Sequence, residues 1–239
     1  MTRTRWTAAW QASLLTGVLT LGTATASDAT ILTFDIGGAQ NFDEISSPYG
    51  SNVTSLTSGS FSYGQGNGFT PNIAVGYATK DLTTNAVVSP TLLHWDVGNG
   101  DLVNVAFPSR LSGHYGEIAL LPQAGTQVRL NSFDLSGFAG NVPGQTVRVM
   151  DGLGTLAEFT NFTVIGDGPG HSPFAFGPGL VSRSGALRVQ FGFDNWDVAI
   201  DNVNFDQLAP VPLPPAVLLM GTGLAGLGAW LRRSPTKTA

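Results

Sequence analysis

The sequence predicts an all-β domain, an antiparallel sandwich of two sheets, and three observations favour it. Short runs rich in β-branched and aromatic residues recur through residues 30–205, separated by clusters of Gly, Asn, Asp and Pro. Several runs alternate apolar and polar side chains, as in Arg188 to Phe193. No long amphipathic helical pattern occurs between residues 28 and 206. We expect a jelly roll, with a barrel as the second choice.

Ten strands are expected, and turn chemistry separates them. Turns are predicted at residues 98–101, 141–144, 151–154 and 166–170, where Gly is combined with Asn, Asp or Pro. The expected strands are Thr30–Ile36, Asn72–Tyr77, Thr91–Val97, Leu102–Phe107, Gly116–Leu121, Gln127–Phe138, Gln145–Met150, Thr155–Ile165, Ala186–Phe193 and Asp197–Phe205.

The last expected strand contains an irregularity. Val198, Ile200, Val203 and Phe205 can all face the core only if a bulge shifts the phase between Ile200 and Val203. The run Ile200-Asp201-Asn202-Val203-Asn204-Phe205 resembles the closing strand of galactose-binding-like jelly rolls.

That resemblance implies a structural Ca²⁺ between the last strand and an N-terminal loop, with Asp43, Glu44 and Asp201 as its candidate ligands. The alternative is that Asp201 satisfies backbone donors in the bulge and that Asp43 and Glu44 form a solvated turn. No other cofactor is indicated.

The N-terminus has the layout of a signal peptide. Arg3 and Arg5 precede an uncharged, largely apolar stretch that ends at Ala24-Thr25-Ala26, a small-residue cleavage site. We expect signal peptidase to cut after Ala26. The alternative, an uncleaved anchor, is disfavoured because the apolar run falls short of the roughly 20 residues of a membrane span.

The C-terminus combines a proline-rich motif, an apolar segment and a basic tail. The motif is Val211-Pro212-Leu213-Pro214-Pro215, and no charge lies between Asp206 and Arg232. Residues 213–231 are numerous enough to cross a bilayer as a helix. Arg232 and Arg233 would remain in the cytoplasm by the positive-inside rule, which leaves residues 27–209 outside the inner membrane.

This order of parts resembles the PEP-CTERM sorting signal, in its VPLPA variant. Pro215 stands before Ala216 where the family usually has one Ala, so the cut position is open. The resemblance implies a Gram-negative bacterial host and an exosortase-like enzyme that cuts near the motif and passes the protein to the cell surface or beyond. The alternative is an ordinary tail anchor.

Composition limits the function of the region between these signals. Residues 27–209 contain all 16 acidic residues but only six cations, for a net charge of −10, which argues against a nucleic-acid partner. The chain has no cysteine, so stability outside the cell must come from the core. Three parts are expected: signal peptide 1–26, ectodomain 27–209 and sorting signal 210–239.

No catalytic motif is present. The three histidines lack ligand spacing, and neither H-E-x-x-H nor G-x-S-x-G occurs. We therefore expect a non-catalytic surface or matrix protein associated with exopolysaccharide or a biofilm, with Trp95 and Trp196 as candidate glycan-binding residues. Two alternatives are a carbohydrate-active enzyme that pairs Glu44, Glu117 or Glu158 with an Asp, and a protein-binding adhesin.

Overall fold

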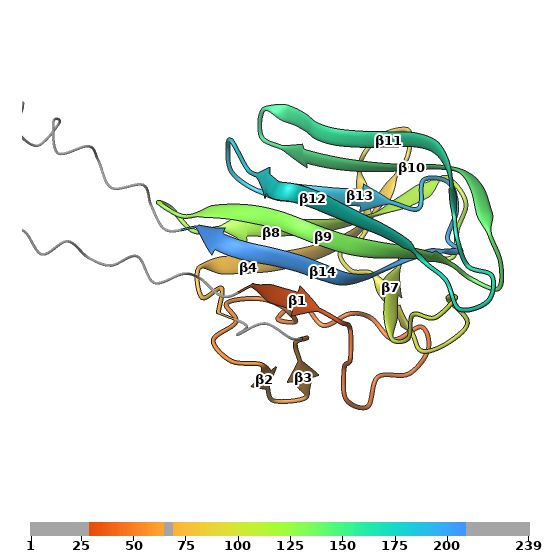
Figure 1. Cartoon of the computed structure of the whole chain (residues 1–239), viewed down its shortest axis with the longest axis horizontal. Helices are drawn as coiled ribbons and strands as arrows, with labels where there is room; N and C mark the ends of the chain where they lie inside the picture. The colour runs from red at the N-terminus through yellow and green to blue at the C-terminus, as the bar shows by residue number, and fades with distance from the viewer. Residues whose placement is uncertain (1–28, 65–68, 209–239) are drawn as a thin grey trace, which may run out of the picture.

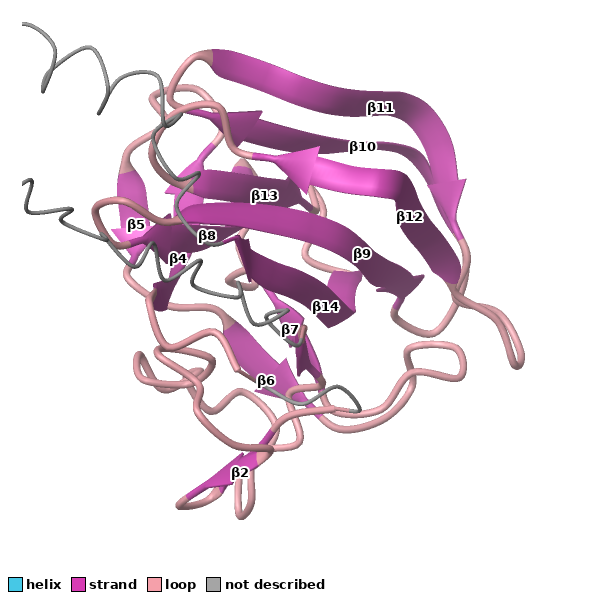
Figure 2. Cartoon of the chain, turned by 60° about the vertical axis from the view of Figure 1, so that its left-hand side comes forward, coloured by secondary structure: helices cyan, strands magenta, loops and turns pink. Residues whose placement is uncertain are grey.

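The computed structural model describes residues 29–64 and 69–208, and strands account for their regular structure (Figures 1 and 2). The all-β, antiparallel prediction is confirmed: two six-stranded sheets face each other, with a small hairpin beside them. Ala24, Ala26, the motif at 211–215 and the segment 213–233 lie outside the described residues. Within the described part of the chain we find no helix with the length and hydrophobicity of a membrane span.

The first sheet has the order β12-β9-β14-β7-β6, with β1 also paired to β14. β9 runs along one edge of β14, while β7 pairs with it at Ile200 and β1 pairs with it from Val203 to Phe205. The strands of this sheet are β1 (Thr30–Leu32), β6 (Leu93–Trp95), β7 (Val105–Phe107), β9 (Gln127–Gly137), β12 (Ser172–Val181) and β14 (Val198–Leu208).

The second sheet has the order β11-β10-β13-β8-β4-β5. From β8 onward the chain passes back and forth between the sheets, except at the β10–β11 hairpin. The strands of this sheet are β4 (Ile73–Asp81), β5 (Val87–Ser89), β8 (His114–Pro122), β10 (Val142–Asp151), β11 (Gly154–Val164) and β13 (Leu187–Phe191). The separate hairpin joins β2 (Thr57–Ser58) to β3 (Phe61–Ser62).

The main core lies between the sheets because their strands alternate buried and exposed residues. In β4, Ile73, Val75 and Tyr77 are buried and the residues between them are half-buried. Phe133 from β9 and Phe191 from β13 bring the two sheets' apolar faces into the same cluster. Because the chain has no cysteine and so no disulfide, the burial of these apolar side chains stabilises the domain.

The predicted bulge in the last strand is confirmed. The pairing of β14 with β9 advances from Asp201↔Asp134 to Asn204↔Ser132, which leaves one extra residue in β14. Asn202 adopts a φ of 50°, a left-handed conformation that Asn tolerates better than most residues. Val198, Ile200, Val203 and Phe205 are consequently all fully buried.

The structure differs from the sequence-based expectation at one predicted turn and at four strands that were not predicted, β2, β3, β5 and β12. The predicted turn at residues 141–144 is wrong: β10 begins at Val142, and the chain turns earlier, at Ala139 and Gly140. A register irregularity between Val142 and Gln145 accommodates Pro143 inside the strand. Strand β12 was not predicted, because the prolines and glycines of residues 173–179 dilute its alternation, and as an edge strand it tolerates them.

Candidate functional site

A second hydrophobic cluster lies on the outer face of the first sheet. Successive side chains of a strand point to opposite faces, so Ala106 of β7 joins the main core while Val105 and Phe107 turn outward. Ala199 of β14 turns outward in the same way, between the inward-facing Val198 and Ile200. Of these outward residues, Phe107 and Ala199 form the floor of the candidate site.

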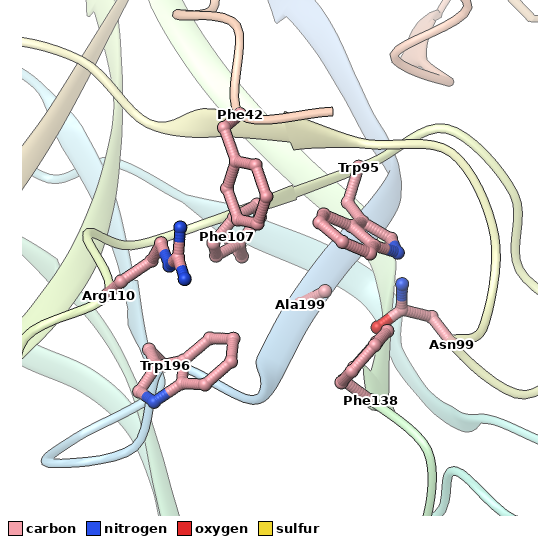
Figure 3. A pocket seen from close by; sticks show the side chains of 8 residues that line it. All are labelled: Phe42, Trp95, Asn99, Phe107, Arg110, Phe138, Trp196 and Ala199. Atoms are coloured by element: carbon pink, nitrogen blue, oxygen red, sulfur yellow. The ribbon is translucent and has the colours of Figure 1, made fainter. Parts of the chain in front are cut away.

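An open cavity of about 200 Å³ stands on this floor. Figure 3 shows five aromatic rings around it, with Asn99 and Arg110 on opposite sides in that view. Its lining comes from segments far apart in the sequence: Phe42, Trp95, Asn99, Phe107, Arg110, Phe138, Trp196 and Ala199. We refer to it below as the aromatic pocket.

The rings of the aromatic pocket contact one another mostly edge to face. The Trp95 centroid is 4.6 Å from that of Phe42 and 5.2 Å from that of Phe138, with near-perpendicular planes. Trp196 closes the other side, 6.4 Å from Phe138 and 6.5 Å from Phe107. Such packing fixes the ring orientations before any ligand arrives.

Two polar side chains interrupt the apolar lining. Asn99 is only 2% exposed as a whole residue and lines the cavity, and its side-chain amide is not among the fully buried polar groups that lack a partner. Because the amide is open to the cavity and no protein hydrogen bond of its side chain is found among the described residues, its donor and acceptor are available to a ligand. Arg110 is exposed at the rim, with its guanidinium carbon 4.2 Å from the Phe42 ring centroid.

Backbone contacts hold the surrounding loops in place. The Phe42 amide donates to the carbonyl of His94 (2.8 Å). Phe42 itself adopts a left-handed backbone conformation, with a φ of 71°. The Phe138 amide donates to the carbonyl of Asp197 (2.7 Å) and thereby joins the loops that carry Phe138 and Trp196. The indole N–H of Trp95 donates to the carbonyl of Val97, which leaves its ring face for the cavity.

Glycine is required where one of these loops packs against its neighbour. Gly100 has a φ of 60°, and a Cβ there would overlap the carbonyl oxygen of Gly170. The loop that follows β6 and carries Asn99 therefore lies directly on the β11–β12 loop.

Trp95 and Trp196, the predicted glycan-binding residues, are brought together by the fold. Both are half-buried and line the same cavity, although about 100 positions separate them in the sequence. Five other residues of the aromatic pocket were not predicted from the sequence: Phe42, Asn99, Phe107, Arg110 and Phe138. No local motif marks these residues, because their convergence depends on how β6, β7 and β14 pair and on which loops cover them.

The three predicted calcium ligands do not form one group. Asp43 accepts a hydrogen bond from the Gln40 amide (2.7 Å), as in a solvated turn, and the neighbouring Glu44 pairs with Leu93 in an isolated bridge. Asp201 is buried in β14. Among residues 29–64 and 69–208, no three or more His, Asp or Glu side chains are placed together to hold a metal ion.

Asp201 instead lies near two other carboxylates, those of Asp35 and Asp134. Burial, followed by the negative charges of Asp35 and Asp134, raises its pKa to about 8, although the Asn202 amide donates to it at 2.7 Å. Asp134 accepts from the Asn202 side chain (2.9 Å), and Asp35 accepts from that of Asn104 (2.6 Å). At neutral pH the Asp201 carboxyl is therefore mostly protonated.

The glutamates considered for glycoside hydrolysis lie away from the aromatic pocket. None of Glu44, Glu117 and Glu158 lines it. Glu117 is hydrogen-bonded to Lys80, Arg188 and Gln190, and Glu158 forms an ion pair with Arg148. The carboxylates of Glu117 and Glu158 are therefore already bound to side chains of the protein.

Comparison with known proteins assigns no family. No family model matches the sequence, and no curated protein matches it. A search of solved structures finds a Podospora anserina GH26-CBM35 β-(1,4)-mannanase with 18% sequence identity and a TM-score of 0.31. The match covers 59% of this chain and 29% of the mannanase chain. A similarity of that extent supports no assignment of function.

Proposed function

We propose that residues 27–209 form a non-catalytic saccharide-binding ectodomain on a jelly-roll frame. One observation carries the proposal: two tryptophans and three phenylalanines from distant segments converge on an open cavity that is also lined by the side-chain amide of Asn99. Aromatic faces suit the C–H faces of a sugar ring, and the Asn99 amide suits its hydroxyls.

The size of the aromatic pocket limits its ligand. At about 200 Å³ it is smaller than the roughly 300–1,000 Å³ of drug-sized ligand sites. It therefore suits one sugar ring, either the end of a glycan or a single side branch, rather than several consecutive units. This supports recognition of exopolysaccharide chains at their ends or branches.

The chemistry of the pocket favours binding over catalysis. Among the described residues that line it, the polar side-chain groups are one amide, one guanidinium and the indole N–H groups of the two tryptophans, and none of them is a carboxyl group. Glycoside hydrolysis uses a pair of carboxyl groups, one as the acid and one as the base or nucleophile, and neither lines this cavity. A binding role at the cell surface or in a biofilm matrix agrees with this lining.

Substitution of either pocket tryptophan by alanine is expected to weaken saccharide binding about tenfold or more, because each supplies a large preorganised face. Titration calorimetry of the full-length chain against neutral and acidic saccharides measures this. Phe159→Ala, which removes a 42% exposed ring outside the pocket, is the matched control. Unchanged affinity in both Trp95→Ala and Trp196→Ala would exclude the pocket as the site.

Tryptophan fluorescence gives a second readout of the same site. Trp95 and Trp196 are the two tryptophans of residues 27–209, since the others are at positions 6, 10 and 230. A fluorescence change on saccharide addition should therefore disappear in the Trp95→Phe, Trp196→Phe double variant. Persistence of the change in that variant would place the ligand elsewhere.

For delivery, we propose export through the N-terminal signal, transient anchoring in the inner membrane and exosortase-like processing near residues 211–215. Mass spectrometry should find the mature protein without Arg232 and Arg233 in cells that have the sorting enzyme, and with them in cells that lack it. An intact tail in both would contradict sorting and leave a plain membrane anchor.

A further inference from the structure

Arg110 differs from every other cation of the ectodomain. The described region contains six Lys and Arg residues, and five of them form ion pairs with carboxylates: Lys80, Arg129, Arg148, Arg183 and Arg188. Within residues 29–64 and 69–208, Arg110 has no ion-pair partner. Residues 27–209 contain 16 acidic residues and only six Lys and Arg, for a net charge of −10. An arginine without a carboxylate partner is therefore unusual in this region.

Arg110 lies where its guanidinium can bind a ligand in the aromatic pocket. Its guanidinium lies over the Phe42 ring, at the rim of the aromatic pocket, and Figure 3 shows it facing the cavity across from Asn99. Stacking on an aromatic ring limits the conformations of the side chain while leaving its N–H donors free. A planar guanidinium held in this way can donate two parallel hydrogen bonds to a carboxylate.

We propose that the aromatic pocket selects a hexuronic acid residue, with the sugar ring against the tryptophans, a hydroxyl on Asn99 and the carboxylate on Arg110. This rests on the proposed saccharide-binding function and names the class of saccharide. The ligand would be an acidic exopolysaccharide that presents a terminal or branching uronate.

The surrounding charge makes the local cation necessary for such a ligand. A field of net charge −10 disfavours polyanions at long range. At physiological ionic strength this field is screened beyond about 8 Å, so one guanidinium at contact distance decides whether a carboxylate is accepted. Selectivity for the acid over the neutral sugar should therefore depend on this single side chain.

Calorimetry with the full-length chain and two matched pairs tests the inference: glucuronate against glucose, and galacturonate against galactose. We expect at least one acid to bind about tenfold or more tightly than its neutral counterpart, and higher salt to reduce that ratio. Arg110→Gln should abolish the preference by lowering the affinity for the acid far more than the affinity for the neutral sugar. Arg148→Gln, at an arginine that also lies over a phenylalanine ring but outside the aromatic pocket, is the matched control.

The outcomes separate this inference from the proposed function. Equal affinity for acid and neutral sugar, or a preference that survives Arg110→Gln, overturns uronate selection while saccharide binding stands. No binding of any of the four sugars overturns both. Because Arg110 is exposed and outside both hydrophobic clusters, its substitution should not unfold the domain, and an unchanged melting temperature verifies this.

Discussion

Replacement of Glu117 by alanine is expected to lower the free energy of unfolding by about 3 kcal/mol, a typical cost of removing one partner of a buried charge network. Glu117 lies on β8 and is 2% exposed. Its carboxylate accepts hydrogen bonds from Lys80 on one side and from Arg188 and Gln190 on the other, each at 2.8 Å. The substitution leaves Lys80, which is itself mostly buried, without its counter-charge.

Urea unfolding at pH 7 measures this effect, and Glu158→Ala is the matched control. Glu158 also pairs with an arginine, Arg148, but both side chains are about one-third exposed, so its loss should cost less than about 1 kcal/mol. Glu117→Gln, which keeps one acceptor oxygen, should fall between the two. Equal stability of the Glu117→Ala and Glu158→Ala variants would show that the β4–β8–β13 network contributes nothing specific.

The same network predicts a loss of stability in acid. Burial opposes ionisation of Glu117, but the hydrogen bonds from Lys80 and Gln190 and the charges of Lys80 and Arg188 outweigh it and hold its pKa below the usual value. A carboxyl whose pKa is lowered by folding stabilises the protein above its unfolded-state pKa of about 4.3. That contribution is lost as the pH falls below this value.

Asp201 is expected to act in the opposite direction, so that Asp201→Asn stabilises the domain at neutral and alkaline pH. Folding raises the pKa of this carboxyl to about 8, against about 3.9 in the unfolded chain. Between these values the folded state holds a proton that the unfolded state releases, so the free energy of unfolding falls as pH rises. The slope from this one group is up to about 1.4 kcal/mol per pH unit.

Urea unfolding of the wild type and Asp201→Asn between pH 4 and pH 9 measures this slope. The asparagine variant should lack it and should exceed the wild type most at the alkaline end. Asp134→Asn removes one neighbouring charge but not the burial, which is the larger cause, so it should reduce the slope only in part. Identical pH profiles for the wild type and Asp201→Asn would contradict the raised pKa.

The fold class could be predicted because its determinants are local. Alternation, β-branched residues and turn chemistry identify a strand wherever it pairs, and all ten expected strands overlap strands of the structure. Even the bulge after Ile200 followed from the phase of four apolar residues. Strand β12 was missed because its prolines and glycines are acceptable only at a sheet edge, and edge position is a property of the sheet order.

The sequence by itself determined an acidic, cysteine-free, all-β domain in which Trp95 and Trp196 were the aromatic side chains to examine. Only the tertiary structure decided that these rings share a cavity with Phe42, Phe107 and Phe138, and that Arg110 lies at its rim without a carboxylate partner among the described residues. The reason is physical. Strand pattern depends on neighbours along the chain, whereas a pocket on the outer face of a sheet depends on which strands pair and which loops fold over them.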